Sequence, residues 1–276
     1  MDAEFTPGIP IRVAPGVQRL LAPNASPLTG PGTNSYLLGD PPTVVLDPGP
    51  AIPEHLAALE RCAPAVETIF VTHTHPDHSP AARVLAIRTG ARLVGRPPPR
   101  DGRQDVTFEP DQIPARGQCF AVAGMLLTAI DTPGHASNHV CYVLESEALL
   151  FSGDHVLDGV TPVILAPDGD MAAYLDSLRR LRELPLRAIA PGHGRVLQDP
   201  IAVIDGVIAH RERREAKVLA VLGSLVRATL DELLPRVYDD VRRELHPLAR
   251  LSLEAHLVKL EREGRCGREG ATWLAR

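Results

Sequence analysis

The segment THTHPDHS at residues 72–79 follows the apolar stretch TIFV and precedes a helical pattern. The apolar stretch predicts a buried strand, so the polar segment is expected to form a strand-to-helix loop. This loop carries four groups that can bind metal, namely His73, His75, Asp77 and His78. Imidazole and carboxylate suit zinc and related transition metals, and one loop cannot place four such ligands around one ion. The spacing therefore favours two neighbouring metal ions.

Three further candidate ligands also follow apolar segments. His135 lies in DTPGHASNH, Asp154 in LLFSGDH and His193 in AIAPGHG. Each is expected at the carboxyl end of a strand, and each has a neighbouring glycine that lets the backbone approach a site closely. Taken together with the 72–79 loop, they predict one shared site.

Strand and helix signals alternate over about the first 200 of the 276 residues, which indicates an α/β fold. Strands are predicted at 35–38, 43–46, 68–71, 92–94, 126–130, 140–144, 148–152 and 188–190. Helices are predicted at 53–62, 80–89 and 171–184.

The pattern changes after residue 199. One long helix is predicted at 200–226, with a charged run HRERREAK between its apolar faces, for which a solvated surface is the default interpretation. Two more helices are predicted at 231–241 and 248–263, and the tail is expected to form a short β-wing. Residues 228–276 are therefore expected to form a small helical module.

Composition excludes two classes of protein. Apolar residues make up 44% of the chain and charged residues 23%, and no run of eighteen apolar residues is present, so the chain is expected to be neither disordered nor transmembrane. The start, MDAEFTPGIPIRV, lacks a signal-peptide pattern, and the four cysteines lack CxxC spacing. We therefore expect a cytoplasmic location, with no membrane partner.

The series VVLDPG (44–49), THTHPDH, His135, SGDH and PGHG resembles the motifs of the metallo-β-lactamase superfamily. The resemblance implies a four-layer αββα sandwich with a dinuclear site at one edge. It also implies that His73, His75 and His135 hold the first metal, that Asp77, His78 and His193 hold the second, and that Asp154 bridges them. Asp47 would support the site from behind the ligands.

Other segments, including GTNSYLLG at 32–39 and HRERRE at 210–215, look most like the β-lactamase-like protein 2 group. Members of this group carry a C-terminal winged-helix-like module. The resemblance thus implies a catalytic domain at 1–199, a linking helix at 200–227 and a winged-helix-like module at 228–276. Flavodiiron-type members of the superfamily carry a glutamate at the position of His75. The resemblance therefore argues against a redox di-iron role.

Our principal hypothesis is a hydrolase in which two Zn²⁺ ions, about 3.5 to 4 Å apart, hold a bridging hydroxide as the nucleophile. Other metals such as Fe or Mn are alternatives. Asp77 or Asp154 would accept the proton of the water. The expected substrate is a small ester, thioester, lactone or amide. The sequence leaves open whether the protein forms a homodimer.

The alternative is an endoribonuclease that cleaves single-stranded RNA and uses the C-terminal module to bind it. The chain has a net charge of −5, but residues 211–276 hold 14 basic and 11 acidic groups, which keeps this hypothesis open. Against it, the sequence shows no basic stripe with interleaved aromatic residues.

The roles of several other polar residues stay open in the sequence. His139 is interpreted as a proton donor in the pocket or as a residue at a helix start, and His155 as a support for a ligand or a structural hydrogen-bonding group. His210 is expected on a solvated helix face. Tyr36, Ser137 and Asn138 are conceivable substrate contacts.

Overall fold

The computed structural model of the chain describes residues 3–276, so residues 1 and 2 of the predicted 1–199 domain lie outside the described part. The chain divides into two compact units. The first comprises Met1–Thr132, Asn138–Val160 and Leu184–Ile201, and the second comprises Pro133–Ser137, Thr161–Glu183 and Ala202–Arg276. Each is described by itself.

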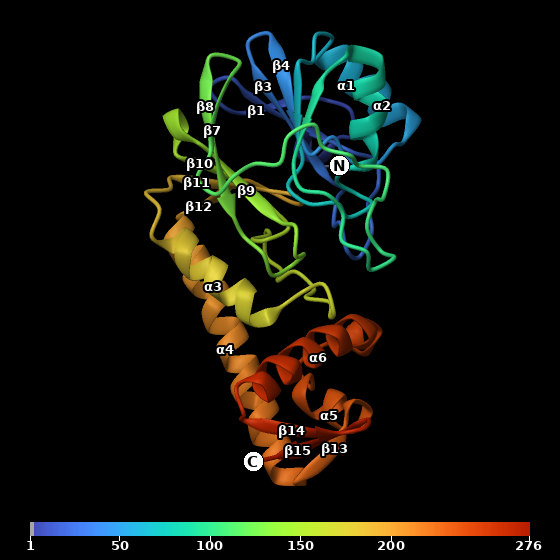
Figure 1. Ribbon diagram of the computed structural model, residues 1–276, viewed down its shortest axis with the longest axis vertical. Helices are drawn as coiled ribbons and strands as arrows, with labels where there is room; N and C mark the ends of the chain where they lie inside the picture. The colour runs from blue at the N-terminus through green and yellow to red at the C-terminus, as the bar shows by residue number, and fades with distance from the viewer. Residues whose placement is uncertain (1–2) are drawn as a thin grey trace. The chain divides into compact units, whose positions relative to one another are not determined.

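The first unit begins with the short 3-10 helix η1 (Ala3–Phe5) and contains two six-stranded sheets. The first sheet runs in the order β1 (Ile11–Ala14), β2 (Val17–Leu21), β3 (Asn34–Gly39), β4 (Pro42–Leu46), β5 (Thr68–Phe70) and β6 (Arg92–Val94). Its first four strands are antiparallel, and β4, β5 and β6 are parallel. Helices α1 (Pro53–Cys62) and α2 (Pro80–Thr89) cover one face of this sheet (Figure 1).

The second sheet runs in the order β12 (Leu197–Gln198), β11 (Ala188–Pro191), β10 (Leu149–Gly153), β9 (Val140–Leu144), β8 (Met125–Asp131) and β7 (Cys119–Val122). The 3-10 helix η2 (Glu145–Glu147) connects β9 to β10. Apolar side chains of both sheets, such as Tyr36, Phe70, Tyr142 and Phe151, form one buried cluster between them. The burial of such large side chains on two facing sheets is what holds a sandwich of this kind together.

Strand direction brings the carboxyl ends of the ligand-bearing strands to one edge. Strands β4 and β5 are parallel, so Asp47 and the loop after β5 leave the first sheet at the same end. Strands β10 and β11 are also parallel, so Asp154 and His193 leave the second sheet side by side. A main-chain hydrogen bond joins the two sheets near these strand ends, from the Val140 N–H to the Thr72 carbonyl at 2.8 Å.

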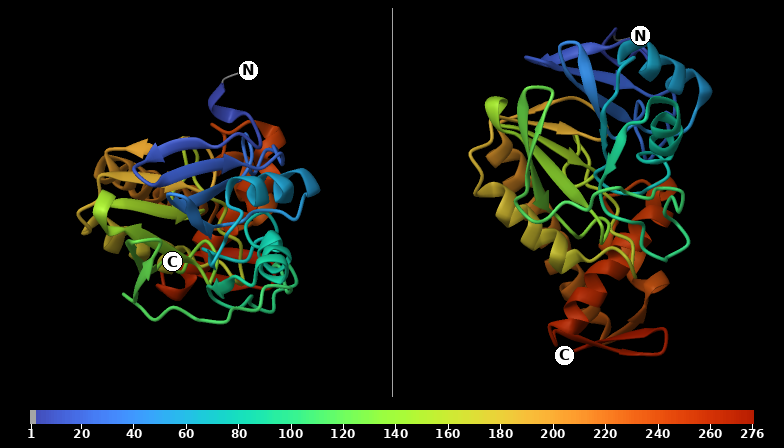
Figure 2. Two further views of the ribbon diagram at one scale, coloured as in Figure 1. Left: turned by 90° about the horizontal axis from the view of Figure 1, so that it is seen from above. Right: turned by 45° about the horizontal axis from the view of Figure 1, so that its top comes forward.

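The second unit contains the remaining helices and a small sheet. Its elements are α3 (Met171–Arg182), α4 (Pro200–Leu225), β13 (Arg227–Thr229), α5 (Leu230–Val237), η3 (Arg243–Leu245), α6 (His246–Arg262), β14 (Cys266–Glu269) and β15 (Thr272–Ala275). The antiparallel hairpin β14–β15 is the predicted wing and is visible in red beside the C-terminus in Figure 2. Thr229 and Glu232 form a capping box that starts α5.

The C-terminal part of this unit has its own apolar core. Val218 and Leu222 of α4 pack with Leu233 of α5, Leu253 of α6 and Trp273 of β15, all of which are buried. Of the helices within residues 3–276, not one combines the length and apolar character needed to cross a membrane.

Every predicted strand and helix is present, but the prediction missed β1, β2, β7, β12 and β13. The buried Arg19 interrupts the apolar pattern of β2, which explains part of this failure. The predicted helix 231–241 is wrong at its end, because α5 stops at Val237. The acidic residues that follow it, Asp239 and Asp240, pair with Lys217 and Arg214 of α4 instead.

Candidate metal centre

The loop after β5 places two imidazole rings against each other. Nε2 of His73 lies 2.9 Å from Nδ1 of His75, and Nδ1 of His73 lies 3.0 Å from the Thr72 hydroxyl. Two ring nitrogens at this separation converge on a common point, which is the arrangement that a shared cation requires.

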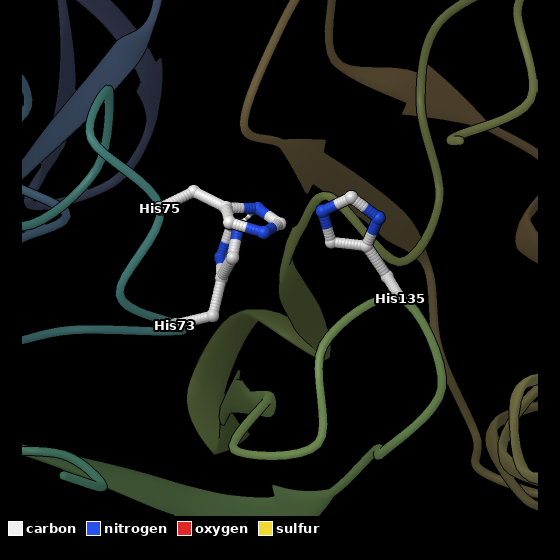
Figure 3. Close-up of side chains that lie close together, drawn as sticks. All are labelled: His73, His75 and His135. Carbon is white, nitrogen blue, oxygen red and sulfur yellow. Dashed lines mark hydrogen bonds between the residues drawn. The ribbon is translucent and has the colours of Figure 1, made fainter. Parts of the chain in front are cut away.

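The His135 ring is oriented by a backbone carbonyl. Nδ1 of His135 lies 2.8 Å from the Val163 carbonyl oxygen, and since a carbonyl only accepts, Nδ1 carries the hydrogen and Nε2 is left as the ligand atom. Ligand atoms of His73, His75 and His135 all lie within 4.8 Å of one another, and Figure 3 shows the three rings together. The three histidines expected to hold the first metal thus form one group.

The other four predicted ligands form a second group within 4.8 Å of one another, made of Asp77, His78, Asp154 and His193. Nε2 of His193 lies 3.2 Å from a carboxylate oxygen of Asp77 and 3.2 Å from one of Asp154. Nε2 of His78 lies 3.3 Å from Asp154 and 3.5 Å from Asp77. Two imidazoles and two carboxylates therefore face one small volume.

Groups behind the ligands fix the tautomers of both histidines in this second group. The buried carboxylate of Asp47 accepts from His78 Nδ1 at 3.0 Å and also from the backbone N–H and hydroxyl of Thr72. Nδ1 of His193 donates to the Gly32 carbonyl at 3.0 Å. In both rings Nε2 is therefore the nitrogen that faces the site.

The donor set fits a transition-metal cation. Nε2 of His78 and of His193 are buried, and although carboxylate oxygens of Asp77 and Asp154 lie 3.2–3.5 Å away, neither nitrogen forms a well-aligned hydrogen bond within residues 3–276. A buried polar atom without a well-aligned hydrogen bond is costly unless something else, such as a bound cation, satisfies it. Glycine at position 192 permits this close approach, because a Cβ there would lie 2.6 Å from Asp154 and 2.7 Å from His78.

The electrostatics of the second group favour positive charge. Burial lowers the pKa of His193, but Asp154 and Asp77 raise it to about 10. Burial likewise lowers the pKa of His78, and the same carboxylates raise it well above its usual value. Burial raises the pKa of Asp154, while His193 and His78 bring it well below its usual value. The carboxylates therefore favour positive charge on the rings, and the same negative charge would favour a bound cation.

Three buried side chains that are not among the predicted metal ligands hold the loop that carries His193. The amide of Asn34 donates to the Pro191 and Gly194 carbonyls at 2.9 and 3.0 Å, and the guanidinium of buried Arg19 donates to the Gly194 carbonyl at 3.1 Å. The Tyr36 hydroxyl donates to the Pro191 carbonyl at 2.7 Å. Tyr36 is therefore a structural support, not a substrate contact.

His139 and His155 are fully buried, and neither begins a helix. The His139 ring stacks on His73 with centroids 4.9 Å apart, and its Nδ1 lies 2.9 Å from the Thr132 hydroxyl. His139 is therefore a buried neighbour of His73, and its role as a proton donor stays a prediction. His155 packs against His139 at 5.5 Å.

The remaining polar candidates serve loop structure. Asn138 is buried and donates to the Thr74 hydroxyl at 2.7 Å. Ser137 is exposed and donates to the carboxylate of Asp168. Neither contact depends on a substrate.

The interpretation of HRERRE as a solvated face is wrong for half of its six residues. Arg211, Arg214 and Glu215 are buried, and His210 is half-buried. Burial and then Arg211 and Arg214 lower the pKa of His210. The sequence pattern missed this burial because it depends on tertiary partners of the arginines.

Comparison with known proteins gives two family matches. Residues 28–193 match the model described as the metallo-beta-lactamase superfamily, and residues 229–273 match one described as a beta-lactamase associated winged helix domain. The beta-lactamase-like protein 2 homolog of Drosophila melanogaster is 31% identical over 272 residues, which cover 92% of this chain and 90% of that protein.

Two further similarities extend over nearly the whole chain. An Aspergillus aculeatus protein named atrochrysone carboxyl ACP thioesterase AacuM is 32% identical over 289 residues, covering 96% of this chain and 88% of its own. The crystal structure of a metallo-beta-lactamase family protein from Thermus thermophilus matches with a TM-score of 0.80 at 26% identity, over 96% of this chain and 100% of that one. The predicted fold class and its C-terminal winged-helix module are confirmed.

Proposed function

Because the chain belongs to the metallo-beta-lactamase superfamily and gathers both groups of predicted ligands, we propose that it is a dinuclear-metal-dependent hydrolase of thioesters. We assign the first metal to His73, His75 and His135 and the second to Asp77, His78 and His193, with Asp154 as the bridge. Zinc suits this nitrogen and oxygen donor set, and iron or manganese are alternatives.

The observation that carries the proposal is the pairing of two adjacent ligand groups. The rings of His73 and His78, one from each group, have centroids 4.3 Å apart. Two cations held by groups this close would act on one substrate.

Metal ions bound here would make hydroxide available from water near neutral pH and polarise the bond under attack. Asp77 is the natural proton acceptor, because its side chain is 26% exposed whereas that of Asp154 is only 12% exposed. Asp47, through its bond to His78, keeps that ring from turning. Hydrolysis would then need no nucleophilic side chain.

The thioester assignment rests on the relative named as an ACP thioesterase, which aligns with nearly the whole of this chain. Small oxyesters, lactones and amides are the neighbouring substrate classes. Residues 1–199 would carry the chemistry, and the helix 200–227 would link them to the 228–276 module.

RNA is the less favoured substrate because the winged-helix region has no excess of positive charge. Residues 229–273 contain eight basic and nine acidic residues. Several of the basic side chains form ion pairs: Arg250 with Asp231, Lys259 with Glu215, and Arg262 with Asp170. A region without excess positive charge is expected to give little counterion release on RNA.

The proposal is tested by elemental analysis of protein purified without chelator, followed by a substrate panel. We expect about two metal ions per chain. The panel contains an acyl-pantetheine thioester, the matched oxyester, a lactone and single-stranded RNA across a salt series, with His193→Ala as the inactive control. Thioester hydrolysis no faster than in this control, or RNA cleavage with steep salt dependence, would overturn it.

A further inference from the structure

Arg211 is a buried arginine in the middle of the long helix α4. Arg211 is only 3% exposed. Its guanidinium lies 5.5 Å from the centroid of the Tyr174 ring of α3. Nη2 donates to the carbonyl of Pro162. Burial of a guanidinium is costly unless its N–H groups have specific acceptors. The contact with the Pro162 carbonyl is therefore expected to have a structural role.

The acceptor is adjacent in sequence to the group that orients His135. Pro162 precedes Val163, whose carbonyl accepts the hydrogen bond from His135 Nδ1 at 2.8 Å. Arg211 therefore restrains the peptide that sets the direction of the His135 ring.

A second anchor holds the other side of the same histidine. The backbone N–H of Asp170 donates to the Gly134 carbonyl at 2.8 Å, next to His135. The Asp170 side chain caps α3 and pairs with Arg262 at the end of α6. The approach is tight, because a Cβ on Gly134 would lie 2.3 Å from the Tyr174 backbone.

We propose that Arg211 and Arg262 are positioning residues, which hold the 161–170 segment so that His135 keeps its ligand nitrogen toward the first metal. The inference rests on the proposed metal-dependent function. It gives the C-terminal helices a role in metal retention, in addition to any role in substrate selection.

The test compares Arg211→Met and Arg262→Met with Arg213→Met, a control at an exposed position of the same helix as Arg211. Each full-length chain is loaded with zinc, checked for folding by circular dichroism and dialysed against graded chelator. Retained zinc per chain is then measured, and the absorption spectrum is recorded after cobalt substitution, because it reports ligand geometry directly.

We expect Arg211→Met to lose one zinc at a chelator concentration about 10- to 100-fold lower than the wild type. The loss should be only about 2- to 5-fold for Arg262→Met, whose exposed ion pair contributes less. The cobalt spectrum should change in both variants and stay unchanged in Arg213→Met. In a His135→Ala background, Arg262→Met should have no further effect on retention.

Retention and spectra identical to those of Arg213→Met would overturn the inference. If Arg211→Met does not fold, Arg262→Met decides, because its side chain is 62% exposed and its replacement leaves the core intact. A wild-type chain that binds none of zinc, iron and manganese would instead refute the proposed function.

Discussion

Replacement of Glu215 by glutamine is expected to weaken the C-terminal module in a pH-dependent manner. The Glu215 carboxylate, 10% exposed, lies 2.8 Å from Lys259 Nζ, 2.9 Å from Arg265 Nη1 and 3.6 Å from His256 Nδ1. Burial raises the pKa of Glu215, but His256 and Lys259 bring it from its ordinary value of 4.5 to about 2. The ionised carboxylate is therefore favoured in the folded state.

This shift corresponds to at most about 3 kcal/mol of stability at pH 7. Because Arg265 is half-exposed, solvent screening reduces the expected contribution to about 1–2 kcal/mol. Since the folded pKa lies below the unfolded one, the contribution is present above about pH 5 and is lost as the pH falls toward 2.

The assay is urea denaturation of wild type, Glu215→Gln and the exposed control Glu244→Gln at several pH values from 7 to 3. Fluorescence reports the module selectively, because Trp273 is the single tryptophan of the chain and is buried in the module core. The quantity compared is the difference in unfolding free energy between variants, in which the effect of metal loss at low pH cancels. A difference of zero at pH 7, or one that does not shrink on acidification, would refute the reasoning.

Three further outcomes are expected from the site. His193→Ala should lower bound metal from about two ions to about one, and an unchanged content by elemental analysis would show that this ligand is misassigned. Asp154→Ala should weaken metal binding more than Asp47→Asn, whose loss of an acceptor behind the ligands is expected to cost about 10- to 100-fold in chelator competition; equal losses would contradict these roles. Gly134→Ala should destabilise the fold by about 1–3 kcal/mol, since its Cβ meets the Tyr174 backbone at 2.3 Å, and a normal denaturation midpoint would contradict this contact.

The ligands were predictable from the sequence because each one follows an apolar strand. The strand before Asp154 and the one before His193 are neighbours in a parallel pair, so local pattern and strand direction together bring the two side chains to one edge. The distances between ligand groups could not be predicted, since they depend on how the strand ends of the two sheets are joined, for example by the bond from Val140 to Thr72.

The groups behind the ligands were largely invisible to sequence reasoning. Arg19 lies within a strand and Arg211 within a helix, where a charged residue ordinarily indicates an exposed face. Each is buried because it meets backbone carbonyls distant in the chain, those of Gly194 and Pro162. An acceptor that is distant in the chain leaves no pattern in the local sequence. The local sequence around each arginine therefore predicts a solvated surface.

Part of the positive charge of residues 211–276 is used in such internal contacts. Arg211 contacts the segment that orients His135, whereas Arg214 and Glu215, one turn further along α4, bond to Asp240 and to Lys259 of the module. One short stretch of helix thus carries restraints on both a metal ligand and the C-terminal core. A substitution that loosens the module at Glu215 is therefore expected to act on α4 as a whole. Part of the positive charge that kept an RNA partner open in the sequence is used within the protein itself.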